Sequence, residues 1–591
     1  MLERFGARAL AQVEELVTRF HGTRALATRE LAAYGRRFGH GWEIPGLCAG
    51  SGHQLRILIP SALPFHPPRV AVSPAPRSLS WPHVEDHGLL CLLPDAAGHS
   101  ILDPQSVVLT LLADAVDLVG AGHAGSNLEH FEAEFLSYWA RWDKTTAAMS
   151  VMCRPEGPTR WVSSWHGERK ALFAENVETL RRWVHNTHGA EAAERLVPQA
   201  MPLLWLPRPL RPSEYPTAVS GLLSLVGELR AGPELVEQLL LDQGTGYKSL
   251  VLGFNSPHGA GFVGLNVVEP NLPPGRESPL TKGFRGRPPR GVLLTRYRGF
   301  PLIGATARRF DASWTLGRDH NPSVRDLQAR SAVVLGVGSV GASVAELLAK
   351  AGVGRIVLVD EGVFDSANIG RHVLGAQALG ANKASALAQL LSARFPHLTI
   401  NDQPSSLEEV NSRSPDLLRK ADLIISTMGN WRSESLLSAL AVDAADLPPI
   451  LFGWTEAHAA AGHAVVCFPR QGCLRCISDD SGHPSLAVAT WPTGGALVPV
   501  PACGGFFQPY GAIELAHIHA LIADLAVEVL LGQVTASTHR VWVGRRKVIQ
   551  SNSGAWNAKW IARYGDPGEG GLILTVGFNP DPHCPLCVAG R

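Results

Sequence analysis

A glycine-rich stretch in the second half of the chain has the residue types and spacing of a phosphate-binding turn. Gly336, Gly338 and Gly341 follow an apolar, strand-like run and open a helical pattern. Backbone N–H groups at such a helix start can approach a phosphate chain at the positive end of the helix dipole. Asp360 ends the next strand-like run, at the distance where a carboxylate usually meets a ribose hydroxyl. The pattern predicts a nucleotide site, which by itself suits a NAD-dependent dehydrogenase as well as an ATP-using enzyme.

Cationic and amide side chains near this turn favour adenylation over hydride transfer. Asn368, Arg371 and Lys383 come just after the second strand, and Arg318 lies in the approach to the first. When a carboxylate attacks the α-phosphate of ATP, positioned Arg and Lys side chains stabilise the charge that develops on the phosphates. Hydride transfer needs no such cations. We therefore predict ATP-dependent adenylation of a carboxylate; the alternative is that these residues are isolated surface charges.

Four cysteines have the spacing of ligands to a structural zinc ion. They form two Cys-x-x-Cys pairs, Cys473 with Cys476 and Cys584 with Cys587. Four thiolates in such pairs enclose a tetrahedral Zn²⁺ ion, and a site closed in this way serves folding rather than catalysis. Free or oxidised thiols are the alternative.

Two further cysteines are candidate nucleophiles. Cys503 stands between a proline-rich stretch and a long helical pattern, beside Gly504 and Gly505. A helix start favours the thiolate, and flanking glycines leave its approach open. Cys91 lies in an apolar Leu-Leu-Cys-Leu run, which taken alone more often indicates a core residue. Three other cysteines are interpreted as structural because their settings are apolar or featureless: Cys48, Cys153 and Cys467.

An α/β protein of three domains is expected to position these residues. Residues 1–149 begin with a helical pattern, continue with short strands and a proline-rich passage before Cys91, and end with two helical patterns. Residues 150–312 mix helical and strand-like stretches in a central α+β linker domain, with a strand expected at 291–299. Residues 313–591 open with a βαβ unit, which predicts a doubly wound, Rossmann-like parallel sheet.

Composition limits the partners and the location of this chain. The 591 residues are 45% apolar and 18% charged, with a formal net charge of +1. No overall field therefore favours nucleic acid or an anionic membrane surface as a partner. The first twenty residues lack the features of a signal peptide, and no apolar run was expected to reach the ~20 residues that span a bilayer. We expect a cytoplasmic protein with reduced thiols.

The C-terminal domain resembles the ThiF-like superfamily, which includes ubiquitin-activating enzymes and bacterial adenylyltransferases of thiamine and molybdopterin synthesis. The resemblance runs from about Trp314 to Cys587 and rests on the glycine turn and on Asn368-x-x-Arg371 followed by Lys383. It implies ATP contacts by these residues, Mg²⁺ and Zn²⁺ as cofactors, an acyl group passed from the adenylate to Cys503, and a homodimer.

Two positions depart from the pattern of that superfamily. Gly362 stands where the superfamily usually has a second Asp, and Gly429-Asn430 stands where it has Asp-Asn, whose Asp helps to hold magnesium. The Mg²⁺ ligands are therefore left open, with Asp422 and Glu434 as candidates.

The N-terminal domain resembles the ubiquitin-conjugating fold. The resemblance rests on the order of its elements and on three motifs: Pro64-Phe65-His66-Pro67-Pro68-Arg69-Val70, Trp81-Pro82-His83-Val84 and Gly88-Leu89-Leu90-Cys91-Leu92. It implies that Cys91 carries a thioester. The His-Pro-Asn triplet of the family is absent, which leaves His83 or His87 as candidates for stabilising the oxyanion.

The two resemblances together match the fused activating and conjugating enzymes of bacterial anti-phage CBASS operons. They imply adenylation of a protein C-terminus, a thioester on Cys503, transfer to Cys91, and amide formation on a lysine of a target protein. The activated partner would have a free, glycine-like C-terminal tail and be a cGAS-like nucleotidyltransferase or, in related fusions, a small ubiquitin-like protein. A sulfur-carrier adenylyltransferase, a dehydrogenase and a non-enzymatic scaffold are the alternatives.

Overall fold

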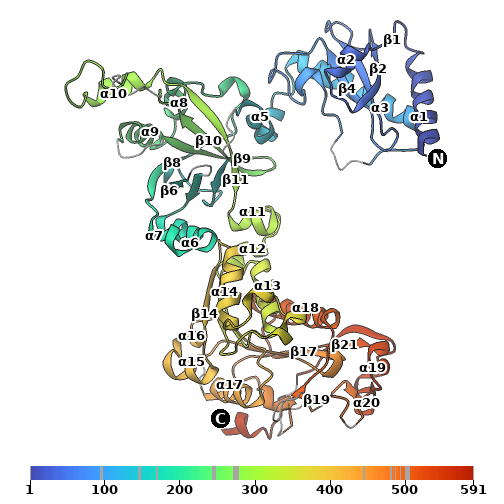
Figure 1. Ribbon diagram of the computed structural model, residues 1–591, viewed down its shortest axis with the longest axis vertical. Helices are drawn as coiled ribbons and strands as arrows, with labels where there is room; N and C mark the ends of the chain where they lie inside the picture. The colour runs from blue at the N-terminus through green and yellow to red at the C-terminus, as the bar shows by residue number, and fades with distance from the viewer. Residues whose placement is uncertain are drawn as a thin grey trace. The chain divides into compact units, whose positions relative to one another are not determined.

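The computed structural model describes residues 2–589 apart from 94–97, 144–147, 168–170, 243–247, 271–277, 444–445, 480–481, 483, 486, 493, 500–505 and 579. The chain forms two compact units (Figure 1). The first comprises residues 1–173 and 199–308, and the second comprises residues 174–198 and 309–591. The segment 174–198, which lies in the expected linker domain, thus packs with the C-terminal unit.

The N-terminal part of the first unit is a four-stranded antiparallel sheet with helices, in the order β1-β2-β3-β4. Its elements are α1 (Leu2–Val17), β1 (Arg24–Ala25), α2 (Thr28–Ala32), β2 (Phe38–Ile44), β3 (Gln54–Pro60), β4 (Arg69–Ser73), α3 (Pro104–Ala124), α4 (His130–Ala133) and α5 (Phe135–Trp142). By length and composition alone, α3 is long and apolar enough to cross a membrane, although Asp114 and Asp117 interrupt its apolar residues. Val108, Leu111 and Val119 of α3 are nevertheless buried against this sheet and α1, which explains its apolar character.

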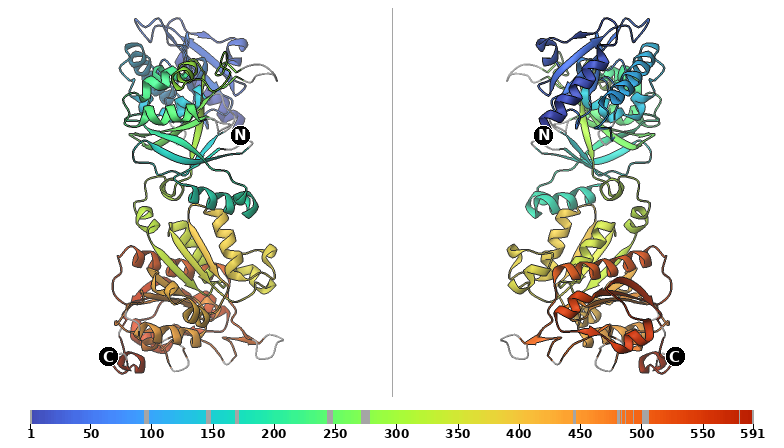
Figure 2. Two further views of the ribbon diagram at one scale, coloured as in Figure 1. Left: turned by 90° about the vertical axis from the view of Figure 1, so that its left-hand side faces the viewer. Right: turned by 90° about the vertical axis from the view of Figure 1, so that its right-hand side faces the viewer.

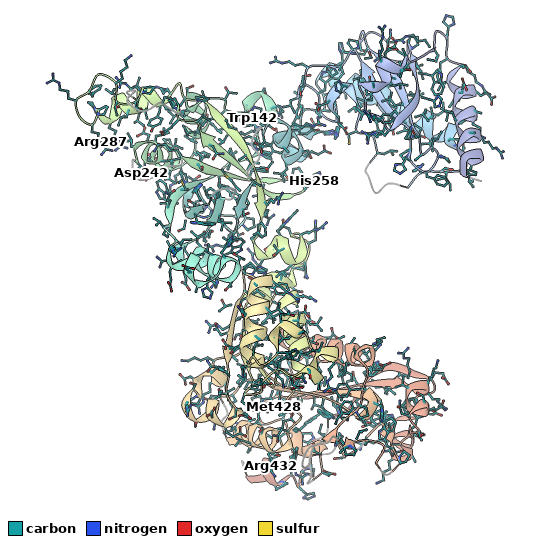
Figure 3. The ribbon with its side chains drawn as sticks, in the orientation of Figure 1. Trp142, Asp242, His258, Arg287, Met428 and Arg432 are labelled. Atoms are coloured by element: carbon teal, nitrogen blue, oxygen red, sulfur yellow. The ribbon has the colours of Figure 1, made fainter. Side chains whose placement is uncertain are left out.

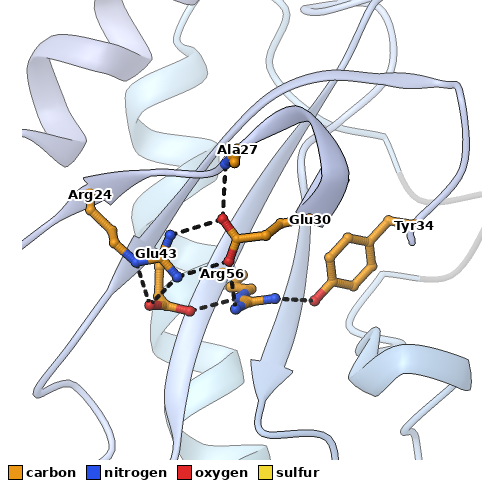
Figure 4. Close-up of polar contacts among 6 residues, drawn as sticks. All are labelled: Arg24, Ala27, Glu30, Tyr34, Glu43 and Arg56. Atoms are coloured by element: carbon orange, nitrogen blue, oxygen red, sulfur yellow. Dashed lines mark hydrogen bonds and ion pairs between the residues drawn. The ribbon is translucent and has the colours of Figure 1, made fainter. Parts of the chain in front are cut away.

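A network of ion pairs holds α2 against the first strands of this sheet. Arg24 pairs with Glu30 at 2.9 Å and with Glu43 at 2.7 Å, and Arg56 pairs with Glu43 at 2.7 Å (Figure 4). The hydroxyl of Tyr34 accepts a further hydrogen bond from Arg56 at 3.4 Å. Isolated exposed pairs contribute little, but a shared network fixes geometry, and here it sets the position of α2 on the sheet.

The central part of the first unit is a closed barrel in the strand order β10-β11-β5-β7-β6-β8-β9. Its strands and helices are β5 (Met149–Val151), β6 (Arg160–His166), β7 (Ala171–Ala174), β8 (Gln199–Trp205), α8 (Val219–Val226), α9 (Gly232–Leu241), β9 (Ser249–Ser256), β10 (Gly259–Val267), α10 (Arg290–Tyr297) and β11 (Leu302–Arg309). The strand expected at 291–299 is wrong, because this stretch is α10. Leu293 and Tyr297, four residues apart, are its buried face.

Helix α5 joins the two parts of the first unit. The indole nitrogen of Trp139 donates to the carbonyl of Ala305 in β11 at 3.2 Å. Trp142, labelled in Figure 3, fits beside Gly304, where any Cβ would come within 2.6 Å of its ring. The N-terminal sheet and the barrel are therefore linked by buried aromatic packing.

The second unit is an eight-stranded sheet in the order β14-β13-β12-β15-β16-β17-β21-β23, covered by helices on both faces (Figure 2). Its main elements are α6 (Val177–His188), α7 (Ala190–Glu194), α11 (Ala312–Gly317), α12 (Ser323–Gln328), β12 (Ser331–Leu335), α13 (Gly341–Ala351), β13 (Arg355–Val359), α14 (Lys383–Arg394), β14 (Thr399–Gln403), α15 (Leu407–Arg413), α16 (Asp416–Arg419), β15 (Leu423–Ser426), α17 (Trp431–Asp443), β16 (Ile450–Thr455), β17 (Ala461–Cys467), α18 (Ala512–Leu530), β21 (Thr538–Arg545), α19 (Arg546–Ser551), α20 (Ala558–Tyr564), β23 (Gly570–Val576) and α21 (Pro585–Ala589). Two short ribbons, β18 (Ala489–Thr490) with β22 (Ala555–Trp556) and β19 (Val498–Pro499) with β20 (Phe506–Phe507), complete it.

This sheet is doubly wound, as the sequence predicted, but only β12 to β16 are parallel. Strand β17 is antiparallel to β16, because a short turn joins them directly, and the pairs β17–β21 and β21–β23 are also antiparallel. One core packs α13, α14 and α18 on one face, and a second core packs α15, α16 and α17 on the other. Strand order reverses between β12 and β15, and ligands of such sheets bind at the carboxyl ends of the strands at this switch point.

Candidate functional site

The glycine turn lies at this switch point, between β12 and α13. Gly336 has φ +81°, a conformation that favours glycine. A Cβ on Gly341 would lie 1.9 Å from the carbonyl oxygen of Gly336 and 2.3 Å from the hydroxyl of Thr427. Gly338 faces open space, with no atom within 4 Å of a Cβ placed there. The turn is therefore tightly closed on itself while its outer side is free for a phosphate.

Asp360 and Lys383 meet beside the turn. The Asp360 carboxylate accepts hydrogen bonds from the backbone N–H groups of Val337 at 2.8 Å and Gly362 at 2.7 Å. Lys383 begins α14, and its amine lies 3.3 Å from the position that a Cβ on Gly362 would take. The structure thus brings the predicted ribose acid and one predicted phosphate cation to the same side of the turn.

Arg371 and Asn368 lie on the 3₁₀ helix Ser366–Arg371, which borders the turn. The next residue, His372, donates from Nε2 to the carbonyl of Val337 at 2.8 Å and accepts from the N–H of Leu374 at 3.0 Å. Burial lowers the pKa of His372, which fits this neutral tautomer. His372 therefore fixes the end of the helix that carries Arg371 against the glycine turn.

Arg318 is not brought to the turn within one chain. It follows α11, whose Leu316 packs against Gly352 at the far end of α13. Because α13 has eleven residues, its two ends are about 16 Å apart. The predicted contact between Arg318 and phosphate stays a prediction.

Two cavities open beside the turn. One, of about 170 Å³, is lined by residues that follow β12 to β15: Gly336, Val359, Asp360, Glu361, Ser405, Ser406, Leu407, Glu408, Met428, Asn430 and Ser433. Met428 and Arg432, labelled in Figure 3, lie after the end of β15, and Arg432 is in the first turn of α17. A second cavity, of about 500 Å³, is lined by Gly429, Glu434, Trp454 and Trp491 and by small residues such as Ala457. Gly429 lines the second cavity and the next residue, Asn430, lines the first, so adjacent residues in the segment after β15 border both cavities.

The two candidate magnesium ligands lie at opposite ends of the sheet. Asp422 precedes β15 and accepts hydrogen bonds from the N–H and hydroxyl of Ser331 at 2.8 and 2.7 Å. The expectation for Asp422 is wrong, because one strand length of about 13 Å separates it from the turn. Glu434 is buried at the correct end and accepts from the Ser426 hydroxyl at 3.0 Å. Burial raises the pKa of Glu434 to about 7.

The four predicted zinc ligands converge, although the two pairs are more than a hundred residues apart. Sγ separations are 3.7 Å for Cys473–Cys584, 3.6 Å for Cys476–Cys587 and 4.0 Å for Cys473–Cys476. All four sulfur atoms lie within 4.8 Å of one another. Zn–S bonds of about 2.3 Å in a tetrahedron require sulfurs about 3.8 Å apart. The cluster has the size and ligand chemistry that Zn²⁺ needs.

Cys91 is exposed, although the two preceding residues of the Leu-Leu-Cys-Leu run, Leu89 and Leu90, are buried. The N–H of Leu90 donates to the carbonyl of Val70 at 2.8 Å, which draws Leu89 and Leu90 onto the sheet. The N–H of Cys91 donates to the carbonyl of His83 at 2.8 Å. The alternative that Cys91 belongs to the core is therefore excluded, and its thiol is accessible, as a nucleophile requires. Cys48, Cys153 and Cys467, interpreted as structural, are buried.

A polar group that we call the His83 cluster lies next to Cys91 in the fold: His83, His130, Glu134 and Tyr138. The rings of His83 and His130 share a hydrogen bond of 2.8 Å, and His83 Nδ1 lies 3.4 Å from the Glu134 carboxylate. The Tyr138 hydroxyl accepts from the N–H of His83 at 2.9 Å and donates to Glu134 at 3.2 Å. Burial lowers the pKa of His83, so the ring is neutral at neutral pH. His87, the other candidate, instead has its ring edge against Tyr34.

The sequence did not identify three members of this cluster. His130, Glu134 and Tyr138 are spaced by four residues, so the signal of a common helical face was present. Cys503, the predicted first acyl acceptor, lies outside the described residues together with Gly504 and Gly505.

Known proteins resemble both ends of this chain. Residues 314–542 match the ThiF family, and residues 20–148 match the prokaryotic E2 family B. The ATP-dependent ubiquitin transferase-like protein Cap2 of Pseudomonas aeruginosa is 24% identical over 514 residues, which are 82% of this chain and 87% of that protein. The SAMP-activating enzyme E1 of Haloferax volcanii is 26% identical over 31% of this chain and 66% of its own length.

Among solved structures, Escherichia coli MccB with ATP matches 45% of this chain and 69% of its own, at 16% identity and a TM-score of 0.31. The two family matches fall on the two halves that carry the glycine turn and Cys91. The chain therefore combines a ThiF domain with a prokaryotic E2 family B domain, which makes it a fused ubiquitin-activating and ubiquitin-conjugating-like enzyme.

Proposed function

We propose that this enzyme activates the C-terminal carboxylate of a protein with ATP and attaches that protein to a lysine of a target. The observation that carries this proposal is the exposed Cys91, whose backbone N–H donates to the carbonyl of His83, in a chain whose other unit gathers Asp360, Arg371 and Lys383 around a glycine turn. A nucleotide site alone would suit several chemistries, whereas an accessible thiol gives the activated acyl group an acceptor.

Adenylation is the first step. A carboxylate oxygen of the substrate attacks the α-phosphorus of ATP, and pyrophosphate leaves. Arg371 and Lys383 stabilise the charge on the phosphates, while Asp360 holds the turn through Val337 and has free lone pairs for the ribose. Mg²⁺, when bound, would neutralise part of the phosphate charge, and Glu434 is the candidate acid at this edge of the sheet. Zn²⁺ would be held by the four-cysteine cluster and would tie α21 to the rest of the unit.

The cavity of about 500 Å³ supports an extended C-terminal tail as the substrate. Its lining residue Gly429 adjoins Asn430 of the nucleotide cavity, so a tail lying in it would bring its terminal carboxylate toward the phosphates. Its wall includes the bulky rings of Trp431, Trp454 and Trp491, which leave little room for large side chains beside a peptide backbone. A tail of glycine-like residues fits this shape.

Acyl transfer completes the reaction. The Cys503 thiolate attacks the carbonyl of the adenylate and AMP leaves; the Cys91 thiolate then attacks the thioester, and the Cys503 thiolate leaves. A target lysine amine attacks the Cys91 thioester, the Cys91 thiolate leaves, and neutral His83 accepts a proton from the amine. Glu134 stabilises the imidazolium that forms, since its carboxylate lies 3.4 Å from His83 Nδ1.

Non-reducing gels of the purified protein with ATP, Mg²⁺ and a candidate carrier test this scheme. We expect Cys503→Ala to abolish both thioesters and Cys91→Ala to leave the one on Cys503. Cys48→Ala, which removes a buried thiol in the same domain as Cys91, is the control. A thioester on Cys91 that survives in Cys503→Ala would overturn the order of transfer.

Two outcomes would favour the alternatives. Product formation that is unaffected by Cys91→Ala would favour a sulfur-carrier adenylyltransferase. Thermal stabilisation by NAD but not by ATP would favour a dehydrogenase.

The identity of the partners is a further part of the proposal. We infer a cGAS-like nucleotidyltransferase of an anti-phage CBASS system as the activated protein, with a small ubiquitin-like protein as the second candidate. Support comes from the sequence resemblance to CBASS fusions and from the match to Cap2 along 87% of that protein. We also propose a cytoplasmic homodimer. Mass spectrometry of conjugates formed in cells, together with light scattering of the purified enzyme, tests these assignments.

A further inference from the structure

Arg371, the cation assigned to the phosphates, lies between two aromatic rings. Its guanidinium carbon is 5.1 Å from the ring centre of Tyr510 and 5.4 Å from that of Phe507. A guanidinium at this distance from an aromatic face is attracted by the ring and restricted in its orientations. Both rings come from the segment before α18, far in sequence from the 3₁₀ helix that carries Arg371.

Tyr510 also contacts the glycine turn directly. Its hydroxyl lies 3.0 Å from the hydroxyl of Ser339, the residue between Gly338 and Val340 in the turn. The carbonyl of Pro509, the preceding residue, accepts from the N–H of His458 at 2.7 Å, which fixes this segment to the sheet. One half-buried side chain therefore touches the phosphate turn at one end and the phosphate cation on its face.

We propose that Tyr510 is a positioning residue for adenylation: its ring aims the Arg371 guanidinium at the phosphates, and its hydroxyl sets the distance of that ring from the glycine turn. The proposal rests on the proposed function, because Arg371 serves phosphates only if the turn binds ATP. Phe507 also packs against the Arg371 guanidinium, but it has no hydroxyl group with which to bind the glycine turn. Since Phe507 and Tyr510 follow Cys503 by four and seven residues, the segment that would deliver the acyl acceptor is also the one that orients the cation.

Binding of ATP and of adenosine to the full-length protein, measured by calorimetry and competition, tests this role. ATP reports on the phosphates, and adenosine reports on the rest of the nucleotide pocket. Tyr510→Leu removes the ring, and Tyr510→Phe keeps the ring and removes the hydroxyl. Tyr564→Leu is the matched control, because Arg563 lies 5.4 Å from the Tyr564 ring in α20, on another part of the unit. Phe507→Leu is the second variant if Tyr510→Leu fails to fold.

We expect Tyr510→Leu to weaken ATP binding about tenfold and adenosine binding less than twofold, and Tyr510→Phe to weaken ATP binding about threefold. In an Arg371→Ala background, Tyr510→Leu should change ATP affinity by less than about twofold, because a residue that acts through Arg371 has nothing left to orient. Equal losses for ATP and adenosine, or additive losses in the double variant, would overturn the positioning role while leaving the proposed function intact. A wild-type protein that does not bind ATP, or an Arg371→Ala variant with unchanged ATP affinity, would instead overturn the proposed function.

Discussion

Glu434 should make the stability of the C-terminal unit depend on pH, and a single substitution should remove that dependence. The residue is 8% exposed, and its carboxyl group accepts hydrogen bonds from the Ser426 hydroxyl at 3.0 Å and from the backbone of Gly429. Burial disfavours the charged carboxylate and raises the pKa to about 7 from the ordinary value of 4.5. The neutral acid is thus the form that the folded protein prefers.

The size of the effect follows from this shift. A difference of about 2.5 pKa units, at 1.36 kcal/mol per unit, corresponds to about 3 kcal/mol. Between pH 4.5 and 7 the folded protein holds a proton that the unfolded chain has released, so the free energy of unfolding falls as pH rises. The stabilisation is fully present below about pH 4.5 and is lost by about pH 7, above which the contribution is flat.

Glu434→Gln keeps the size of the side chain and cannot ionise, so it should be insensitive to pH over this range. Amide hydrogen exchange of β15 and α17, corrected for intrinsic rates, measures the local free energy of opening in both proteins from pH 5 to pH 8. We expect the variant to gain about 2 to 3 kcal/mol over wild type as pH rises to 8. Glu409→Gln, on the exposed face of α15, is the control and should follow wild type. Parallel pH profiles for wild type and Glu434→Gln would refute the assignment.

Three further predictions concern the other parts of the site. His83→Ala should slow discharge of the Cys91 thioester to lysine by about 10²-fold in single-turnover assays and leave loading of the thioester intact, whereas His87→Ala should change neither; equal effects of the two would contradict the role of His83. Cys584→Ser should remove about one zinc per chain by elemental analysis and lower the unfolding temperature of the C-terminal unit, and a metal-free wild type would contradict the zinc assignment. Gly341→Ala should destabilise the fold, because its Cβ would lie 1.9 Å from the Gly336 carbonyl oxygen. Gly338→Ala should unfold at the same temperature as wild type, because its Cβ meets no atom within 4 Å, but should bind ATP more weakly. Thermal unfolding measures the first effect and calorimetry measures the second.

The glycine turn could be predicted from the sequence because it is local. Strand, turn, helix and strand follow one another without interruption from β12 to β13, and each part has its own pattern of apolar residues and glycines. The same is true of the two Cys-x-x-Cys pairs, whose chemistry implies convergence across any distance in sequence. Short-range pattern and ligand chemistry therefore sufficed for these two features.

Contacts between distant elements could not be predicted. His83 meets His130 and Glu134 because α4 and α5 pack beside the loop before Cys91, and α5 is held there by its burial against the barrel. The stretch 291–299 could not be assigned from its sequence, because a short apolar run suits a strand or a helix equally well, and the helical period appears only in the buried pair Leu293 and Tyr297. Tertiary packing, rather than local preference, decided both cases.

Gly362 stands where the family usually has a second Asp, and the geometry around it gives a physical reason for the glycine. A Cβ at this position would lie 2.8 Å from Asp360 Oδ1 and 3.3 Å from the amine of Lys383. The Asp360 carboxylate could move away only by breaking hydrogen bonds, because it accepts from the backbone N–H groups of Val337 and of Gly362 itself. A side chain at Gly362 would therefore require the Asp360 carboxylate to shift and the end of the Lys383 side chain to adjust by a few tenths of an ångström. The absence of a side chain at Gly362 therefore leaves room for the positions that Asp360 and Lys383 take beside the nucleotide turn, and Gly362→Asp should weaken ATP binding because it displaces Asp360 from the turn.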